Sequence, residues 1–286
     1  MIRKFSSENR FHIPPAFIAL MCKQIIQSSV SYGFPVWVPP AGSHVHAYDL
    51  TIKPFARAIG CPWNAGPAGC LIETGILPFE ILWEYMALSF GSKLFKSNSI
   101  ALKSLSKEFH QIPKSNVCKT NSPLGAVLKL LEIEWKVSSH TVKKSDLLRK
   151  RSALTNKYLE KKGYSLSVMK FKTNIGKTAP YLWLPNEFAS CVFRFRNGYG
   201  PDLCSLIKRG LYRNRKDICR LCNNFPESRF HILCECPFSK AIQPSSWRSM
   251  EVSWFLSDSS FEHEDFFRIA AFLKSLYNEL SGRIPS

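Results

Sequence analysis

The chain has 286 residues, of which 45% are hydrophobic and 21% are charged. This composition excludes a wholly disordered or fibrous chain, and at roughly 150 residues per domain the length predicts two domains. Lysine and arginine together number 39 and aspartate and glutamate 21, which gives a formal net charge of +18. Such a charge favours binding to a polyanion. Nucleic acid is the commonest polyanion, and an acidic membrane surface is the alternative.

No segment has the length of a transmembrane helix. The longest uncharged apolar run covers residues 13–22 and contains Pro14 and Pro15, whereas a span needs about 20 apolar residues. The run also lacks a convincing signal-peptide cleavage site. We therefore expect an intracellular protein, in the nucleus or the cytoplasm, with no membrane partner. Its ten cysteines then need a role other than disulfides, because these compartments keep thiols reduced.

The helical spacing of apolar residues predicts a mostly α fold, and no succession of alternating strands is visible. Residues 61–70 and 170–186 are expected to be irregular, and residues 96–123 to form a linker or a surface excursion. The predicted helices cover 15–31, about 47–59, a stretch after Pro78, a stretch from Leu124 to Trp135, 143–162, 186 to about 197, and a last helix with apolar positions from 266 to 280.

The segment 217–240 (DICRLCNNFPESRFHILCECPFSK) carries the strongest chemical signal. Cys219, Cys222, His231 and Cys236 follow the pattern C-x2-C-x8-H-x4-C, and zinc prefers four tetrahedral ligands of thiolate sulfur and imidazole nitrogen. Two cysteines separated by two residues can turn both sulfurs onto one ion, and Asn223-Asn224 supports a turn just after the pair. The pattern predicts one zinc ion per chain. The alternative is a chance grouping of buried thiols and an imidazole.

The spacing inside this motif constrains the local fold. Ser228 is a candidate cap for a short helix that starts near Pro226. His231 and Cys236 lie five residues apart, so they meet the same ion only if that helix ends or loosens between them; Pro237 is consistent with such an ending. Cys234 competes with Cys236 as the fourth ligand. Four protein ligands leave no position for a catalytic water, so we expect a structural site.

Residues 193–242 resemble the C-terminal zinc-knuckle region of non-LTR (LINE-type) retrotransposon reverse transcriptases. In that family an Arg-x-Arg-x-Gly helix end leads through a basic stretch into C-x2-C, a Glu-Ser/Thr pair, a His, two apolar residues and Cys-Pro. The family's last ligand is the cysteine before proline, so the resemblance favours Cys236. The residues that carry the pattern here are Arg194, Arg196, Gly198, Cys219, Cys222, Glu227, Ser228, His231, Ile232, Leu233, Cys236 and Pro237.

The N-terminal part resembles the thumb of the same family. Residues 24–40 are similar to a segment in which a helix ends in Tyr-Gly and a Trp follows, and residues 50–80 to a helix, a loop and a Glu-x-Gly-x-x-Pro stretch, here Glu73, Gly75 and Pro78. The resemblance covers most of 15–100 and 185–280. It implies a thumb-like helical region at 1–100, a linker and basic helical connector at 101–184, and a helical C-terminal region at 185–286 that carries the CCHC zinc knuckle.

The catalytic residues of the family's polymerase have no match. Two-metal catalysis in its palm needs paired aspartates, and this chain contains no Asp-Asp dipeptide. The acidic residues after the knuckle lack the lysine pattern of an endonuclease and are expected to be solvated acids before the last helix: Asp258, Glu262, Glu264 and Asp265. We therefore expect a non-catalytic chain, the thumb-to-knuckle tail of a reverse transcriptase detached from its catalytic part.

Two basic clusters are candidate nucleic-acid contacts. The first lies in 143–162 and could displace counterions from a phosphate backbone, with a solvated charged face as the alternative: Lys143, Lys144, Arg149, Lys150 and Arg151. The second precedes the knuckle, and tyrosines among its cations suit stacking on unpaired bases: Arg194, Arg196, Lys208, Arg209, Tyr212, Arg213, Arg215 and Lys216. For Arg194 and Arg196, the alternative is that one faces solvent and the other a structural partner.

The resemblance implies that such tails hold template RNA or target DNA for target-primed reverse transcription, alongside the remainder of the retroelement polymerase. Two other hypotheses stay open at this point. The knuckle could instead hold a protein partner, or the gene could be a decayed copy with no selected function. RNA or DNA binding that falls steeply with salt is the expectation that separates the first hypothesis from the others.

Overall fold

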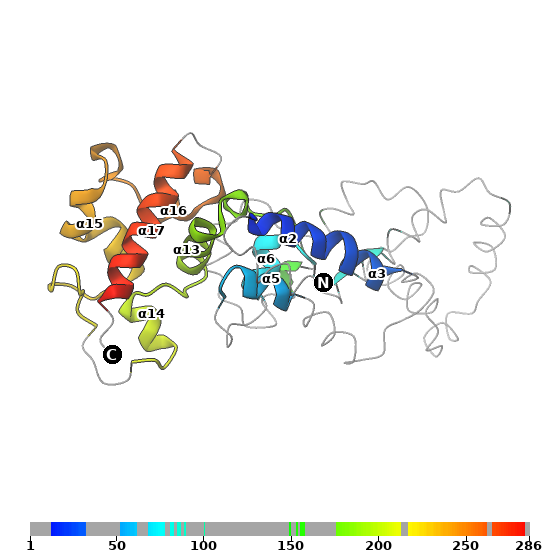
Figure 1. Cartoon of the computed structure of the whole chain (residues 1–286), viewed down its shortest axis with the longest axis horizontal. Helices are drawn as coiled ribbons and strands as arrows, with labels where there is room; N and C mark the ends of the chain where they lie inside the picture. Colours follow the sequence, from blue (N-terminus) through cyan, green and yellow to red (C-terminus); the bar gives the residue numbers. More distant parts are fainter. Residues whose placement is uncertain are drawn as a thin grey trace. The chain divides into compact units, whose positions relative to one another are not determined.

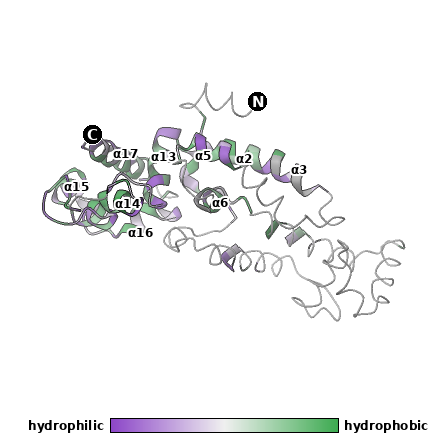
Figure 2. Ribbon diagram, turned by 90° about the horizontal axis from the view of Figure 1, so that it is seen from below, coloured by the Kyte–Doolittle hydropathy of each residue, from purple (hydrophilic) through white to green (hydrophobic). Residues whose placement is uncertain are grey.

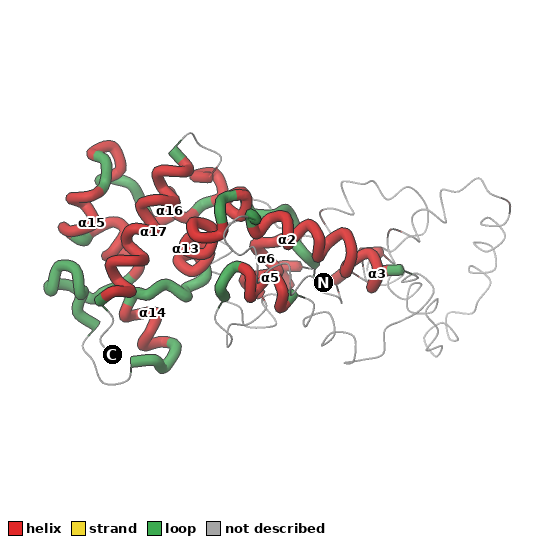
Figure 3. The backbone as a smooth tube through the Cα atoms, viewed as in Figure 1, coloured by secondary structure: helices red, strands yellow, loops and turns green. Residues whose placement is uncertain are grey.

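A computed structural model of the chain describes residues 13–32, 52–61, 68–77, 176–212, 217–261 and 265–283, together with a few helical positions between 81 and 157. Every regular element among these residues is helical (Figure 3). The one β interaction among them is an isolated antiparallel bridge between Ile218 and Pro226. The predicted mostly α class is therefore confirmed for the part of the chain that the structure describes.

The chain divides into two compact units. Unit 1 comprises residues 1–21, 52–76 and 165–286, and unit 2 comprises residues 22–51 and 77–164. Each unit is assembled from segments that are far apart in the sequence. The predicted division into 1–100, 101–184 and 185–286 names functional regions in sequence order and stays a prediction.

The first predicted helix, 15–31, is present. Helix α2 (Pro15–Met21), a π-helical stretch η1 (Cys22–Gln27) and α3 (Ser28–Ser31) follow one another without a break. Pro15 stands in the first turn, where its missing N–H is not needed. Ala16, Ile18 and Ala19 are buried, as expected for an apolar helix. At Tyr32 the backbone becomes extended, which ends the helix.

Two short helices follow in unit 1. Helix α5 (Lys53–Ala58) is the described part of the helix predicted at 47–59, and residues 47–51 lie outside the described residues. Helix α6 (Ala68–Thr74) shows that the irregular structure predicted for 61–70 is wrong at 68–70. Burial explains the difference, because Cys70, Leu71 and Ile72 all enter the core and helical geometry satisfies their backbone groups.

The core of the C-terminal part lies between two predicted helices. Helix α13 (Asn186–Arg196) packs against α17 (Phe266–Gly282), and Figure 1 shows the pair side by side. Figure 2 shows that both helices carry hydrophobic and hydrophilic residues. The hydrophobic ones face inward at helical spacing, as in Ile269, Leu273, Leu276 and Leu280 of α17, which are all buried.

Short helical elements complete this part. One of them was predicted: the short helix expected to start near Pro226 begins at residue 229 and continues as η3 (His231–Glu235). The others were not predicted, because so few residues cannot show a helical period: α14 (Leu203–Lys208), α15 (Pro237–Ile242) and α16 (Val252–Leu256). Three more are single 3-10 turns: η2 (Pro180–Trp183), η4 (Ser245–Trp247) and η5 (Asp258–Phe261). The stretch 170–186, predicted to be irregular, contains η2.

Other predictions fall outside the described residues. The linker at 96–123 is described only at residue 100, and the helix from Leu124 to Trp135 is not described at all. Of the basic segment 143–162, residues 149, 153 and 155–157 are described and helical. Within the described residues, the helices are all too short or too polar to cross a bilayer.

Candidate metal centre

The four predicted zinc ligands meet in space. One donor atom from each of Cys219, Cys222, His231 and Cys236 lies within 4.8 Å of all the others. The Sγ atoms of Cys219 and Cys236 are 4.0 Å apart, and Cys222 Sγ lies 3.2 Å from His231 Nε2. Tetrahedral ligands at zinc bond lengths of about 2.0–2.3 Å are separated by roughly 3.5–3.8 Å. The donor types and their spacing fit a zinc-sized ion.

A tight turn brings the first two cysteines together. Cys219 N donates to Phe225 O at 2.7 Å, beside the bridge between Ile218 and Pro226. Asn223 N donates to Cys219 O at 2.7 Å, and Asn223 has a left-handed φ of 58°. Asparagine tolerates this conformation better than most residues. The predicted turn after the cysteine pair is confirmed.

A π-helical turn brings His231 and Cys236 to the same point. Ser228 Oγ accepts a hydrogen bond from His231 N at 3.0 Å, which caps the turn as predicted. Cys236 N donates to His231 O at 2.7 Å, the five-residue bond of a widened helix. Cys236 itself is extended before Pro237, where α15 begins. The predicted loosening of the helix between His231 and Cys236 is confirmed.

The structure separates the two candidates for the fourth ligand. Cys236 is buried and belongs to the group of converging donors, whereas Cys234 does not. Cys234 is half-buried, and burial raises the pKa of its thiol to about 11. A π turn that directs His231 inward directs the residue five positions later, rather than three, to the same side.

The site is mostly closed to solvent and its thiols differ in acidity. Cys219, His231 and Cys236 are buried, and Cys222 is half-buried. Burial raises the pKa of Cys219 to about 12. Burial also acts to raise the pKa of Cys222, but hydrogen bonds from Asn224 and His231 outweigh it and lower the pKa to about 7. On the far side of the ring, His231 Nδ1 lies 3.6 Å from Glu235 Oε2, which suits a ligand that binds through Nε2.

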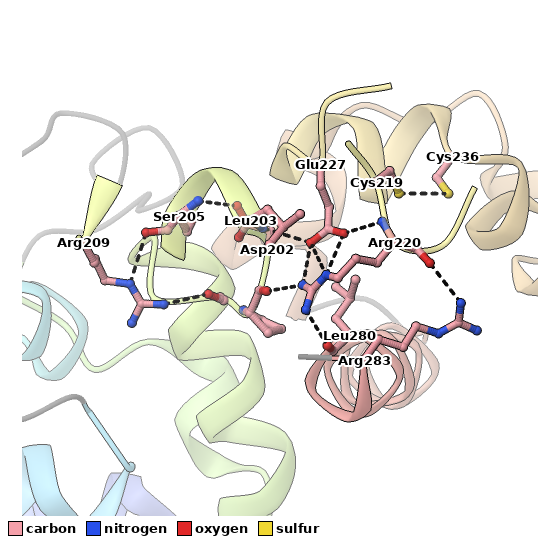
Figure 4. A network of polar contacts seen from close by, with 12 residues as sticks. Asp202, Leu203, Ser205, Arg209, Cys219, Arg220, Glu227, Cys236, Leu280 and Arg283 are labelled. Carbon is pink, nitrogen blue, oxygen red and sulfur yellow. Dashed lines mark hydrogen bonds and ion pairs between the residues drawn. The ribbon is translucent and has the colours of Figure 1, made fainter. Parts of the chain in front are cut away.

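An ion pair beside the first cysteine anchors the metal-binding loop (Figure 4). The Arg220 side chain pairs with the buried carboxylate of Glu227, with Nη2 2.6 Å from Oε1. Glu227 also accepts a hydrogen bond from Leu203 N at 2.9 Å, at the start of α14. Arg220 donates to Pro201 O at 2.6 Å and to Leu280 O at 3.0 Å, near the end of α17. The loop is thereby fixed to α14 and α17.

Arg196 is a correction to the predicted nucleic-acid contacts. Its side chain is fully buried, and it pairs with Glu73 at 2.7 Å and with Asp258 at 2.9 Å. A guanidinium with no exposed surface cannot reach a phosphate, so the structural alternative holds for this residue. Asp258 was expected to be a solvated acid, and that expectation is also wrong, because it is buried against Arg196.

The other predicted contacts divide into three groups. The Arg194 guanidinium makes hydrogen bonds within unit 1, because it donates to Gly60 O and to the Tyr277 hydroxyl. Lys208 is exposed at the end of α14, and Arg209 is half-buried with its side chain bonded to Gly200 O and Ser205 O. Tyr212 is half-buried and Arg149 is exposed. Outside the described residues lie Lys143, Lys144, Lys150, Arg151, Arg213, Arg215 and Lys216.

Two structurally important residues had no signal of their own in the sequence. Arg220 lies between the first two cysteines, and the residues next to it in the sequence do not predict its contacts with Glu227 and Leu280. Glu73 belongs to the Glu-x-Gly-x-x-Pro stretch, but its partner Arg196 lies far along the chain. A charged residue inside an apolar helical stretch is the one hint that could have found it: Glu73 follows Leu71 and Ile72 directly.

Comparisons with known proteins add no family to these observations. No family model matches the chain, and neither a curated protein nor a solved structure matches it. The resemblance to LINE-type reverse transcriptases, and the functions that it implies, therefore stay predictions.

Proposed function

We propose that this chain is a zinc-stabilised, nucleic-acid-binding C-terminal region of a LINE-type reverse transcriptase, which holds template RNA or target DNA without catalysing. The observation that supports it best is the convergence of Cys219, Cys222, His231 and Cys236, because the knuckle is the most specific motif of the resemblance. The formal net charge of +18 supports a polyanionic partner.

The metal in this proposal is one structural zinc ion. Three thiolates and one imidazole are soft or borderline donors, which suit zinc better than magnesium or calcium. The four side chains would fill a tetrahedral shell and leave no place for a catalytic water. The role of the ion is then to hold the loop that follows the basic segment, and the expected content is one zinc per chain.

The nucleic-acid surface in this proposal lies next to the metal loop. Lys208 is exposed at the C-terminal end of α14, whose first turn is tied to Glu227 of the loop. Arg213, Arg215 and Lys216 lie in the sequence between α14 and Cys219. Together with Lys208 and Arg209, these cations form one basic stretch of the sequence directly before the metal-binding motif.

Salt-dependent binding tests the proposal. In fluorescence anisotropy with labelled single-stranded RNA and DNA, the logarithm of the binding constant should fall linearly with the logarithm of the salt concentration. Reversal of Arg213, Arg215 and Lys216 to Glu should weaken binding more than tenfold and reduce the slope by about two to three. The matched control reverses three exposed cations elsewhere, Lys177, Arg248 and Arg268, and so has the same net charge.

Two outcomes would reject nucleic-acid binding at this surface. One is no measurable affinity for RNA or DNA even at low salt. The other is an equal loss in the cluster variant and its control, because then net charge alone, rather than a defined surface, governs binding. Zinc content by metal analysis is read in parallel, so that an unfolded knuckle is not mistaken for a lost phosphate contact.

A protein-binding knuckle is the second candidate, because apolar side chains are exposed on the metal loop. Phe225 is 55% exposed, Phe230 53% and Ile218 40%. Exposed apolar groups on one small loop are typical of a protein contact. Under this alternative, Phe225→Ser with Phe230→Ser abolishes retention of a partner, whereas reversal of Arg213, Arg215 and Lys216 leaves it intact.

A further inference from the structure

Two cysteines outside the metal-binding motif lie together in unit 1. Cys61 follows α5, where Gly60 has a left-handed φ of 66° and Cys61 N donates to Ala56 O at 2.8 Å. Cys70 is a buried residue of α6. Both thiols are free, and the glycines directly before them, Gly60 and Gly69, lie against the side chains of Arg194 and Asn197, one turn apart along α13 and its C-cap. Each thiol is also the largest influence on the other's pKa. The fold therefore places two thiols from the ends of one short segment side by side.

A fixed positive charge stands beside this pair. Arg194 Nε and Nη2 donate to Gly60 O at 3.1 and 2.7 Å, and the Tyr277 hydroxyl also bonds to the guanidinium. The hydrogen bond from Cys70 lowers the pKa of Cys61 against the opposing effect of burial, and the charge of Arg194 lowers it further. The bond to Cys61 and burial raise the pKa of Cys70.

The two thiols thus differ in the way that a nucleophile and a resolving thiol differ. Cys61 is only half-buried, so a small oxidant can reach it, and its environment favours the thiolate, the reactive form. Cys70 is buried and keeps its proton until the second step. By contrast, burial raises the pKa of Cys191 in α13 to about 11, which makes that thiol unreactive.

We propose that Cys61 and Cys70 form a redox-sensitive dithiol, which a hydroperoxide oxidises to a disulfide. The Cys61 thiolate attacks the terminal oxygen of the peroxide, the O–O bond breaks, and Cys61 becomes a sulfenic acid while hydroxide or alkoxide leaves and takes up a proton. The Cys70 sulfur then attacks Cys61 Sγ, the S–O bond breaks, and water leaves with the Cys70 proton. Two thiols lose two electrons in total, and one peroxide gains them.

The test is a peptide map of the full zinc-loaded chain. After treatment with hydrogen peroxide, free thiols are alkylated in denaturant and the digest is analysed by mass spectrometry. We expect a peptide pair linked through Cys61 and Cys70, two hydrogens lighter than the sum of its parts and separated by a thiol reductant. Before oxidation, iodoacetamide should label Cys61 at least about tenfold faster than Cys191.

Variants identify the order of the steps. Cys70→Ser should stop at the sulfenic acid, which dimedone traps on Cys61, and the matched control Cys191→Ser should still form the crosslink. The proposal is overturned if Cys61 and Cys70 remain fully alkylated under peroxide that already oxidises Cys219 and Cys222. It is equally overturned if other cysteine pairs form with the same yield. The map reads each cysteine separately, so the result is independent of nucleic-acid binding.

Discussion

Substitution of Arg196 by Met tests whether the buried ion network holds unit 1 together. Arg196 lies in α13 with no exposed surface, 2.7 Å from Glu73 Oε1 and 2.9 Å from Asp258 Oδ1, and it also donates to Leu256 O. Its guanidinium stacks 5.1 Å from the Tyr181 ring. Methionine has a similar length and leaves no large cavity, so the variant isolates the loss of the charge and its hydrogen bonds.

The expected loss is large because two buried carboxylates remain without their cation. Breaking a buried ion pair by removing one partner costs about 3–5 kcal/mol. For a folded unit of roughly 150–250 residues, each kcal/mol lowers Tm by about 2–4 °C. Thermal unfolding followed by circular dichroism should therefore show Tm lowered by about 6–20 °C in Arg196→Met, with the zinc content unchanged.

A second variant separates charge from packing. When Glu73→Gln and Asp258→Asn are added to Arg196→Met, no buried charge remains unpaired, and stability should recover partly. The reasoning fails if the free energy of unfolding of Arg196→Met lies within about 0.5 kcal/mol of that of the parent protein, because surface substitutions usually cause changes of that size. It fails too if the triple variant is less stable than the single one.

Three further substitutions have matched controls. Cys236→Ser should weaken zinc binding more than about tenfold, whereas Cys234→Ser should change it less than about twofold, as measured by competition with a chromophoric chelator. Gly75→Ala should destabilise by about 2–5 kcal/mol in denaturant unfolding, because φ is 66° and the new Cβ would lie 2.5 Å from the backbone of Gly176. The control Gly210→Ala, with φ of 72° and no atom within 4 Å, should cost only about 1–2 kcal/mol. Asp202→Ala should lower stability by about 1 kcal/mol through loss of the α14 cap to Ser205 N, 2.8 Å away, and Asp202→Asn should restore most of it.

The parts of the fold that were predicted are those in which the signal is local. Helices α13 and α17 are long enough to show the helical period, and Pro185 and Gly198 mark the ends of α13. The metal site was predicted in detail because all four ligands lie within one short segment. There, Asn223-Asn224 predicts a turn after the cysteine pair, and the spacing of His231 and Cys236 requires a helix that ends or loosens between them; the structure contains the turn and a π-helical loosening.

The parts that were missed depend on contacts between distant segments. Arg196 looks like a basic residue of an exposed helix end until Glu73 and Asp258 are brought beside it. Residues 68–70 look like a loop because of Gly69, but burial of Cys70 and Leu71 makes them the start of α6. No local period or spacing carries such information, since it depends on which segment packs against which.

A metal ion bound at these four residues would contribute to the fold in a different way from the ion pair of Arg220 and Glu227. All four metal ligands lie between residues 219 and 236, so an ion bound to them can fold the loop but cannot orient it on the rest of unit 1. Orientation comes from Arg220 and Glu227, whose directional bonds reach Leu203 N and Leu280 O. Replacement of a buried ion pair by apolar residues is often neutral for stability. We therefore expect the Arg220–Glu227 pair to contribute mainly a defined orientation of the loop relative to α14 and α17. Loss of the metal should therefore unfold the loop and release α14, while the packed pair of α13 and α17 stays folded.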